Sequence, residues 1–139
     1  MQTFLPYSDY RKSLSCLDDK RLGKQRVEAM QMVNAIDRGY GAWYNHPCTQ
    51  MWSDYREHLK LYHNIAIELW IDRGMINTMP LYKLTSKKLV KPHWLGNEKF
   101  HSSHRSNLLN KDYSFYSKYK WVEPDNLPYY WNGFALWEQ

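Results

Sequence analysis

The chain has 139 residues, enough for one domain spanning 1–139 with its own core, and a formal net charge of +5. This basic excess favours a polyanionic partner. Nucleic acid fits best, because some of the aromatic residues, 17% of the chain, could stack on bases while most pack at the edge of the core. The 2 cysteines indicate neither a disulfide framework nor a thiolate metal site, and no apolar run reaches the roughly 18 residues of a membrane span. The sequence therefore predicts a soluble, cytoplasmic protein.

Two long helices are predicted in the first half of the chain. Asp18 or Asp19 can cap a helix whose apolar residues recur with a period near 3.6, and the glycines of "DRGYG" end it. Thr49 can cap a second helix of about 24 residues, which continues as an apolar stripe until Gly74. The segment before the first helix, "PYSDYRKSLSC", is expected to be a loop.

The second half is less regular. Pro80 and Pro92 predict loop with short helical turns across residues 75–100. Ser102 or Ser103 can cap a third helix through "HRSNLLNKD", before an aromatic run and a proline-interrupted tail that wraps back over the helices. Every predicted element is helical. The predicted fold class is therefore all-α, a compact domain of about three main helices with long irregular loops and an aromatic C-terminal tail.

One carboxylate, Glu28, interrupts the basic face of the first helix. Arg21 and Lys24 share this face, while the apolar residues lie on another. The pattern alone favours an exposed Lys24–Glu28 ion pair at i,i+4, worth a few tenths of a kcal/mol. The alternative is that Arg21, Lys24 and Arg26 hold phosphates while Glu28 performs acid–base chemistry on a bound nucleotide. Phosphate repels a carboxylate on a DNA-facing surface, so the acid needs a functional reason there.

Four segments in chain order, "MQTFLPY", "LDDKRLGKQRVEA", "NHP" and "HRSNLLNKD", resemble the pyrimidine-dimer DNA glycosylase family, the phage-type endonuclease V enzymes. The resemblance implies an all-α domain that removes cyclobutane pyrimidine dimers from double-stranded DNA, without metal or cofactor. It also implies an essential glutamate on the first helix, which falls on Glu28 when counted from Asp19. A histidine of the phage enzyme is replaced by Arg21 here, so the role of that histidine does not transfer unchanged.

The same resemblance implies that the nucleophile is the α-amine of the first residue of the mature chain. Gln2 has a long side chain, which normally protects an initiator methionine, so the amine belongs to Met1, or to Gln2 if Met1 is removed. An α-amino group ordinarily has a pKa of about 7.7–8.0, so a usable fraction is nucleophilic near neutral pH. The expected chemistry is an imine with the sugar, followed by β-elimination, which makes the protein a DNA glycosylase with AP-lyase activity.

Basic and aromatic residues elsewhere are candidate DNA contacts. Core packing is an equal alternative for Tyr116 and Tyr119, and a local hydrogen bond is the alternative for His46. His101 and His104 have no Cys or carboxylate at ligand spacing beside them, so no metal site is indicated. The candidate DNA-binding residues are Arg21, Lys24, Arg26, His46, Lys87, Lys88, Arg105, Lys111, Tyr116, Tyr119 and Trp121.

The expected partner is double-stranded DNA containing a damaged base, bound by a monomer that has no membrane contact. Two alternatives stay open at this point. One is a glycosylase of the same chemistry for another damaged or modified base, because nothing in the sequence reads the lesion. The other is a non-catalytic helical DNA-binding protein in which Glu28 is only a surface acid. An N-terminal nitrogen on the opposite side of the molecule from Glu28 would exclude the mechanism that uses the terminal amine and Glu28.

Overall fold

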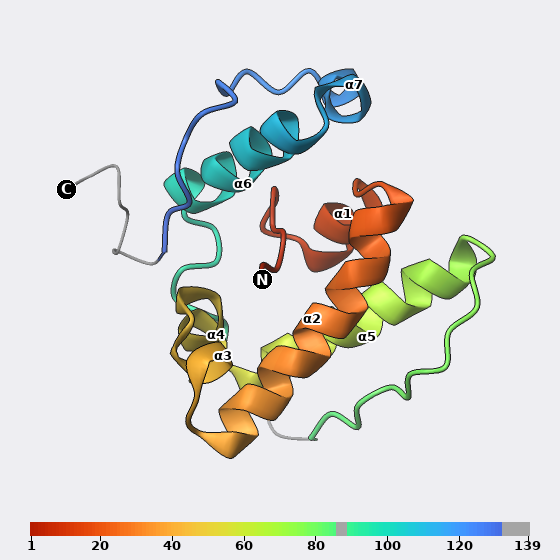
Figure 1. The fold of residues 1–139 in the computed structure, drawn as a ribbon, viewed down its shortest axis with the longest axis vertical. Helices are drawn as coiled ribbons and strands as arrows, with labels where there is room; N and C mark the ends of the chain where they lie inside the picture. Colours follow the sequence, from red (N-terminus) through yellow and green to blue (C-terminus); the bar gives the residue numbers. More distant parts are fainter. Residues whose placement is uncertain (86–88, 132–139) are drawn as a thin grey trace.

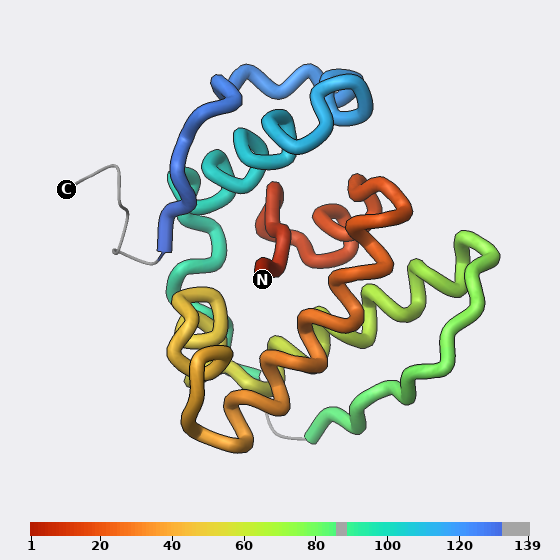
Figure 2. The backbone as a smooth tube through the Cα atoms, in the orientation of Figure 1, coloured from red at the N-terminus to blue at the C-terminus, as the bar shows by residue number. Residues whose placement is uncertain are grey.

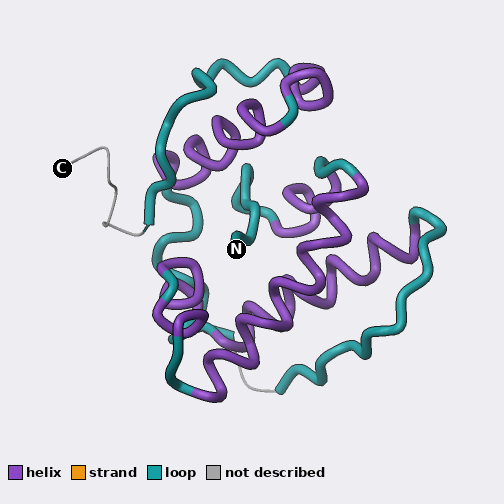
Figure 3. Tube along the Cα trace, viewed as in Figure 1, coloured by secondary structure: helices purple, strands orange, loops and turns teal. Residues whose placement is uncertain are grey.

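The computed structural model describes residues 1–85 and 89–131, and in these ranges it contains helices and loops but no strand (Figures 1 and 3). The predicted all-α class is confirmed. Three helices, α2, α5 and α6, have 20, 17 and 14 residues and are the main elements. The helices are α1 Tyr10–Ser15, α2 Asp19–Arg38, α3 Ala42–Asn45, α4 Pro47–Trp52, α5 Arg56–Asp72, α6 Glu98–Lys111 and α7 Tyr113–Tyr116, followed by the 3-10 turn η1 Ser117–Tyr119.

Helix α2 matches its prediction at both ends. Asp18 is the extended N-cap residue, and Gly39 ends the helix in the left-handed conformation with φ 76°, where glycine has no steric penalty. Along the helix, α2 packs against α5 (Figure 2). Gly23 allows this approach, because a Cβ at this position would lie 2.9 Å from the end of the Trp70 ring.

The prediction of one continuous second helix is wrong. Residues 53–55 divide this region into two helices, α4 and α5. Pro47 occupies the first turn of α4 and His46 caps it, so Thr49 lies inside a helix rather than at its start. The chain turns so that the indole of Trp52, 0% exposed, packs against Tyr62 of α5. Burial of this ring overrides the helical periodicity that runs through the break.

Two further helix boundaries differ from their predictions. Asn97, not Ser102 or Ser103, caps α6 by accepting a hydrogen bond from the Phe100 backbone N–H. Near the N-terminus, α1 forms where a loop was expected, because the Asp9 side chain caps it by accepting from Lys12 N at 2.8 Å. Both missed caps are Asx side chains, which compete well for the first free N–H groups of a helix.

One irregular segment, at the N-terminus, lies in the middle of the fold (Figure 1). The N-terminal residues run without secondary structure between α2 and α6, so the N-terminus lies near the centre of the view in Figure 2. As predicted, the described part of the tail folds back along α6, where Asn107 Nδ2 donates to Leu127 O at 2.9 Å. Among the described residues, no helix has the length and apolar character required to cross a membrane.

Candidate active site

The structure brings the N-terminus to Glu28. The backbone N–H of Gln2 donates a hydrogen bond of 2.9 Å to Glu28 Oε2. Consecutive backbone nitrogens are at most about 3.7 Å apart, so the Met1 nitrogen lies within about 7 Å of this carboxylate oxygen. Among the described residues, Lys24 and Glu28 form no ion pair with each other, so the i,i+4 pair favoured by the sequence pattern is not formed. The carboxylate instead holds the terminal peptide.

Met1 and Glu28 line a polar cavity of about 250 Å³ between α2, α6 and the tail. Four cationic side chains line this cavity together with the carboxylate, three from α2 and one from α6. Such a cavity suits an anionic ligand, because the cations attract phosphate while the amine and the carboxylate lie at the same site. Its lining residues are Met1, Gln2, Phe4, Lys20, Arg21, Lys24, Gln25, Glu28, Lys111 and Tyr129.

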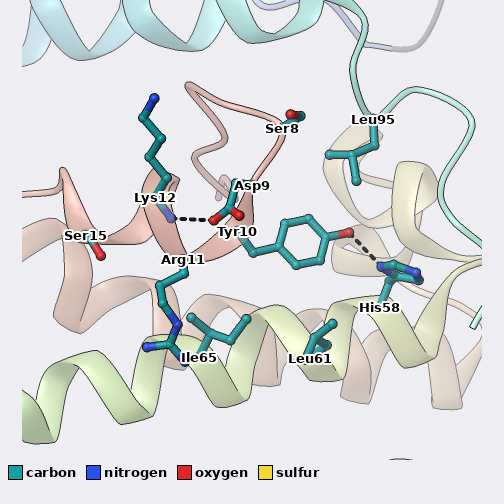
Figure 4. Close-up of a pocket in the computed structure, with 10 residues that line it drawn as sticks. All are labelled: Ser8, Asp9, Tyr10, Arg11, Lys12, Ser15, His58, Leu61, Ile65 and Leu95. Carbon is teal, nitrogen blue, oxygen red and sulfur yellow. Dashed lines mark hydrogen bonds between the residues drawn. The ribbon is translucent and has the colours of Figure 1, made fainter.

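A larger hollow of about 740 Å³ lies elsewhere, between α1 and α5 (Figure 4). Several of its polar side chains are already engaged: Tyr10 Oη lies 2.9 Å from His58 Nδ1, and Arg11 pairs with Glu68 at 2.6 Å. It contains neither Met1 nor Glu28. We therefore assign the candidate active site to the smaller, more basic cavity.

Arg21 is fixed at this cavity by residues behind it. Its guanidinium donates to Asp18 Oδ1 at 3.1 Å, and the Tyr116 hydroxyl donates to the same oxygen. Burial opposes ionisation of Asp18, but the hydrogen bonds from Tyr116 and Arg21 outweigh it and lower the pKa of this carboxyl. Asp18 is therefore anionic at neutral pH and holds Arg21 in one orientation. Lys20 and Lys24, which also line the cavity, are exposed.

His46 lies close to Met1. Its Nδ1 accepts from Cys48 N at 3.1 Å and caps α4, so the local hydrogen bond considered for this residue is present. Burial lowers the pKa of His46, the N-terminal amine lowers it further, and Glu28 opposes both effects. His46 also lines a small hollow of about 260 Å³ with Met1, Ala42 and Trp43. The imidazole is thus neutral at neutral pH and close to the amine–carboxylate pair.

Two arginines predicted to contact DNA have structural partners instead. The Arg26 guanidinium lies 4.6 Å from the centre of the Trp70 ring and donates to Asn77 Oδ1 at 2.6 Å, outside the cavity. Arg105 is 11% exposed, pairs with Glu123 at 2.9 Å and donates to Pro6 O at 2.7 Å. The hydrogen bonds of Arg105 use most of its N–H donors, which leaves it little capacity to bind phosphate. The positions of these charges in the sequence did not reveal their partners.

The aromatic candidates divide between core and surface. Tyr116 is 0% exposed, so core packing, one of its two alternatives, is the role that the structure shows. Tyr119 and Trp121 are half-buried and stacked, with ring centroids 5.2 Å apart, and remain predictions as DNA contacts. Lys87 and Lys88 lie outside the described residues.

Sequence reasoning gave no role to several cavity residues. Lys20 is one turn before Lys24 on the same helix, and this i,i+4 spacing was a usable signal. Gln25 lies on the same helix as the cations but is only 1% exposed. Phe4 and Tyr129 come from irregular segments far apart in the chain, and only the tertiary structure joins them.

The fold and the site together define a small helical protein in which an N-terminal amine and a carboxylate share a cavity for a polyanionic ligand. The family described as pyrimidine dimer DNA glycosylase has a model that matches residues 1–83. The chain therefore belongs to the pyrimidine dimer DNA glycosylase family, and the resemblance is confirmed. No curated protein and no solved structure gives a significant match. The matched range contains Met1, Glu28 and the three cations of α2, and the family's substrate is DNA.

Proposed function

We propose that this chain excises cyclobutane pyrimidine dimers through an imine between the Met1 α-amine and the sugar, and then cuts the strand by β-elimination. The observation that carries the proposal is the hydrogen bond of 2.9 Å from Gln2 N to Glu28 Oε2, because it fixes the amine close to a carboxylate in a basic cavity. Membership of the family supports the glycosylase step in general. The imine and the lyase step rest on the chemistry of the amine and the carboxylate.

The reaction uses only these two groups. The unprotonated amine of Met1 attacks C1′, so that an N–C1′ bond forms and the bond to the pyrimidine breaks with its electron pair on the base. Glu28 takes a proton from the secondary ammonium that results and gives it to O4′ as the C1′–O4′ bond opens, which leaves the imine. The resulting imine acidifies the C2′ proton. Glu28 removes that proton, and the C3′–O bond breaks with its electron pair on the oxygen, which releases the downstream strand with a 5′ phosphate.

DNA must deform to bring C1′ to this cavity. A duplex hides the sugar, so the enzyme must unstack the lesion, and a damaged pair costs less to open. We assign phosphate binding to Lys20, Arg21 and Lys24 on one side of the cavity and to Lys111 on the other. Because these contacts release counterions, binding should weaken steeply with salt.

Trapping with borohydride tests the proposal. Reduction of the imine links the protein to DNA, and peptide mapping of the adduct should place it on Met1. The substrates are duplexes containing a defined dimer, an abasic site or an oxidised base, with undamaged duplex as the control. Adducts on dimer and abasic DNA support the proposal. Adducts with oxidised-base and abasic DNA but not with dimer DNA would show that the enzyme acts on another lesion. Binding without any adduct would show that the protein binds DNA but does not form an imine.

A further inference from the structure

The peptide that carries the amine is held by side chains rather than by secondary structure. From the N-terminus onward, its backbone groups find partners on three helices. Phe4 O lies 2.9 Å from the Tyr62 hydroxyl, while Leu5 N donates to His104 Nδ1 at 2.8 Å. Leu5 O lies 2.7 Å from His101 Nδ1. Buried backbone groups require such partners, so these side chains set the path of the segment.

Gln25 is the side chain that holds this peptide at two points next to the amine. Its Nε2 donates to Gln2 O at 3.1 Å, and its Oε1 accepts from Phe4 N at 2.8 Å. These two contacts fix which end of the amide is oxygen. Tyr62 Oη lies 2.6 Å from the same Oε1 and holds the amide from behind.

Gln25 and Glu28 are three residues apart on α2, so they lie on neighbouring turns of one helix face. Glu28 binds the N–H of Gln2, and Gln25 binds the C=O of the same residue. The Gln2 peptide groups are therefore fixed on both sides by one rigid helix. Glu28 alone would leave the segment free to pivot about a single hydrogen bond.

We propose that Gln25 is a positioning residue, which sets the direction of the Met1 amine relative to Glu28 and the sugar. This inference rests on the proposed function. Gln25 is uncharged and almost fully buried, so it acts on the reaction through the peptide of residues 2–4 and not by proton transfer. A displacement of about 1 Å in a reacting group can slow a reaction by about 10²-fold, although both reacting groups remain present.

The test compares Gln25→Met with wild type and with Gln31→Met, the same change at a half-buried position of α2 outside the cavity. Two quantities are measured on an abasic duplex: the single-turnover rate of borohydride-trapped adduct at saturating DNA, and the DNA concentration at half-saturation. We expect the rate of Gln25→Met to fall by about 10- to 100-fold. The half-saturating concentration should change by less than about 3-fold, and Gln31→Met should match wild type.

Tyr62→Phe provides a second variant in case Gln25→Met does not fold. It removes the hydroxyl behind the amide and leaves Gln25 in place, so a smaller loss of rate, about 3- to 10-fold, is expected at unchanged DNA binding. A folded Gln25→Met that traps at the wild-type rate would overturn the inference, as would a loss explained entirely by weaker DNA binding. If Gln25→Met is unfolded, a wild-type rate for Tyr62→Phe overturns it. Failure of the wild type to form any adduct would instead refute the proposed function.

Discussion

Replacing Glu28 by Gln separates the two roles of this residue. The amide oxygen of Gln can still accept the hydrogen bond of 2.9 Å from Gln2 N, so the terminal peptide keeps its anchor. The negative charge and the ability to exchange a proton are lost. Hydrogen bonds to charged groups contribute about 1.5–3 kcal/mol and neutral ones about 1, so the stability should fall by only about 1 kcal/mol.

The expected effect on the reaction is much larger. General acid–base catalysis contributes about 10²- to 10⁴-fold, equivalent to roughly 3–5 kcal/mol in the barrier. We therefore expect the single-turnover rate of Glu28→Gln on a dimer-containing duplex to fall by about this factor. DNA binding should be equal or tighter, since the formal net charge of +5 rises by one and phosphate no longer meets a carboxylate.

The assay measures the excision rate at saturating DNA and the affinity by fluorescence anisotropy at one salt concentration. Glu68→Gln is the matched control, because Glu68 is an exposed carboxylate of α5 that pairs with Arg11 and lies outside the cavity. It should behave as wild type. A folded Glu28→Gln variant whose rate stays within about 3-fold of wild type would refute acid–base catalysis by Glu28.

Three other predictions address the packing, the core and the terminus. Gly23→Ala should lower the free energy of unfolding by about 1 kcal/mol, although alanine has a higher helix propensity than glycine, because the added Cβ would lie 2.9 Å from the Trp70 ring. A rise in thermal stability would contradict this prediction. Burial lowers the pKa of His104 to about 3, so the unfolded chain binds this proton first, and stability present above pH 6.5 should be lost as the pH falls toward 3. In denaturant titrations at several pH values, His104→Asn should lose less of its free energy of unfolding than wild type as the pH falls. An unchanged dependence on pH would show that other groups cause the loss. One Gly added before Met1 should leave DNA binding intact but reduce trapping by at least about 10²-fold, since the amine moves beyond its anchored position; trapping at the wild-type rate would show that the position is not critical.

Local signals in the sequence predicted some elements well. The boundaries of α2 depend on Asp18 and a left-handed Gly39, and both act within a few residues of the helix end. The break between α4 and α5 depends on the burial of Trp52 against residues distant in the chain. A hydrophobic period cannot show this, because the apolar stripe continues through the break.

The site shows the same division between local and tertiary information. Glu28 stood out because a carboxylate among cations on one helix face is visible in the sequence. Arg26 and Arg105 looked equally available, but Trp70 and Glu123 occupy them in the fold. A charge count cannot distinguish a free cation from one that is already paired, since pairing is a property of the tertiary structure.

An enzyme that uses a chain terminus as its nucleophile, as we propose for this chain, has a particular folding problem, because termini are usually the least ordered part of a domain. Here the terminal segment is buried: Thr3 and Leu5 are each 0% exposed. Burial of an extended peptide among helices requires polar partners that an ordinary helical core would not contain, since unpaired buried polar groups are costly. Gln25, Tyr62 and His104 supply these partners from three different helices. Buried polar residues on the core faces of α2, α5 and α6 thus mark the path of the N-terminal peptide, and they connect the stability of the helical core to the position of the amine.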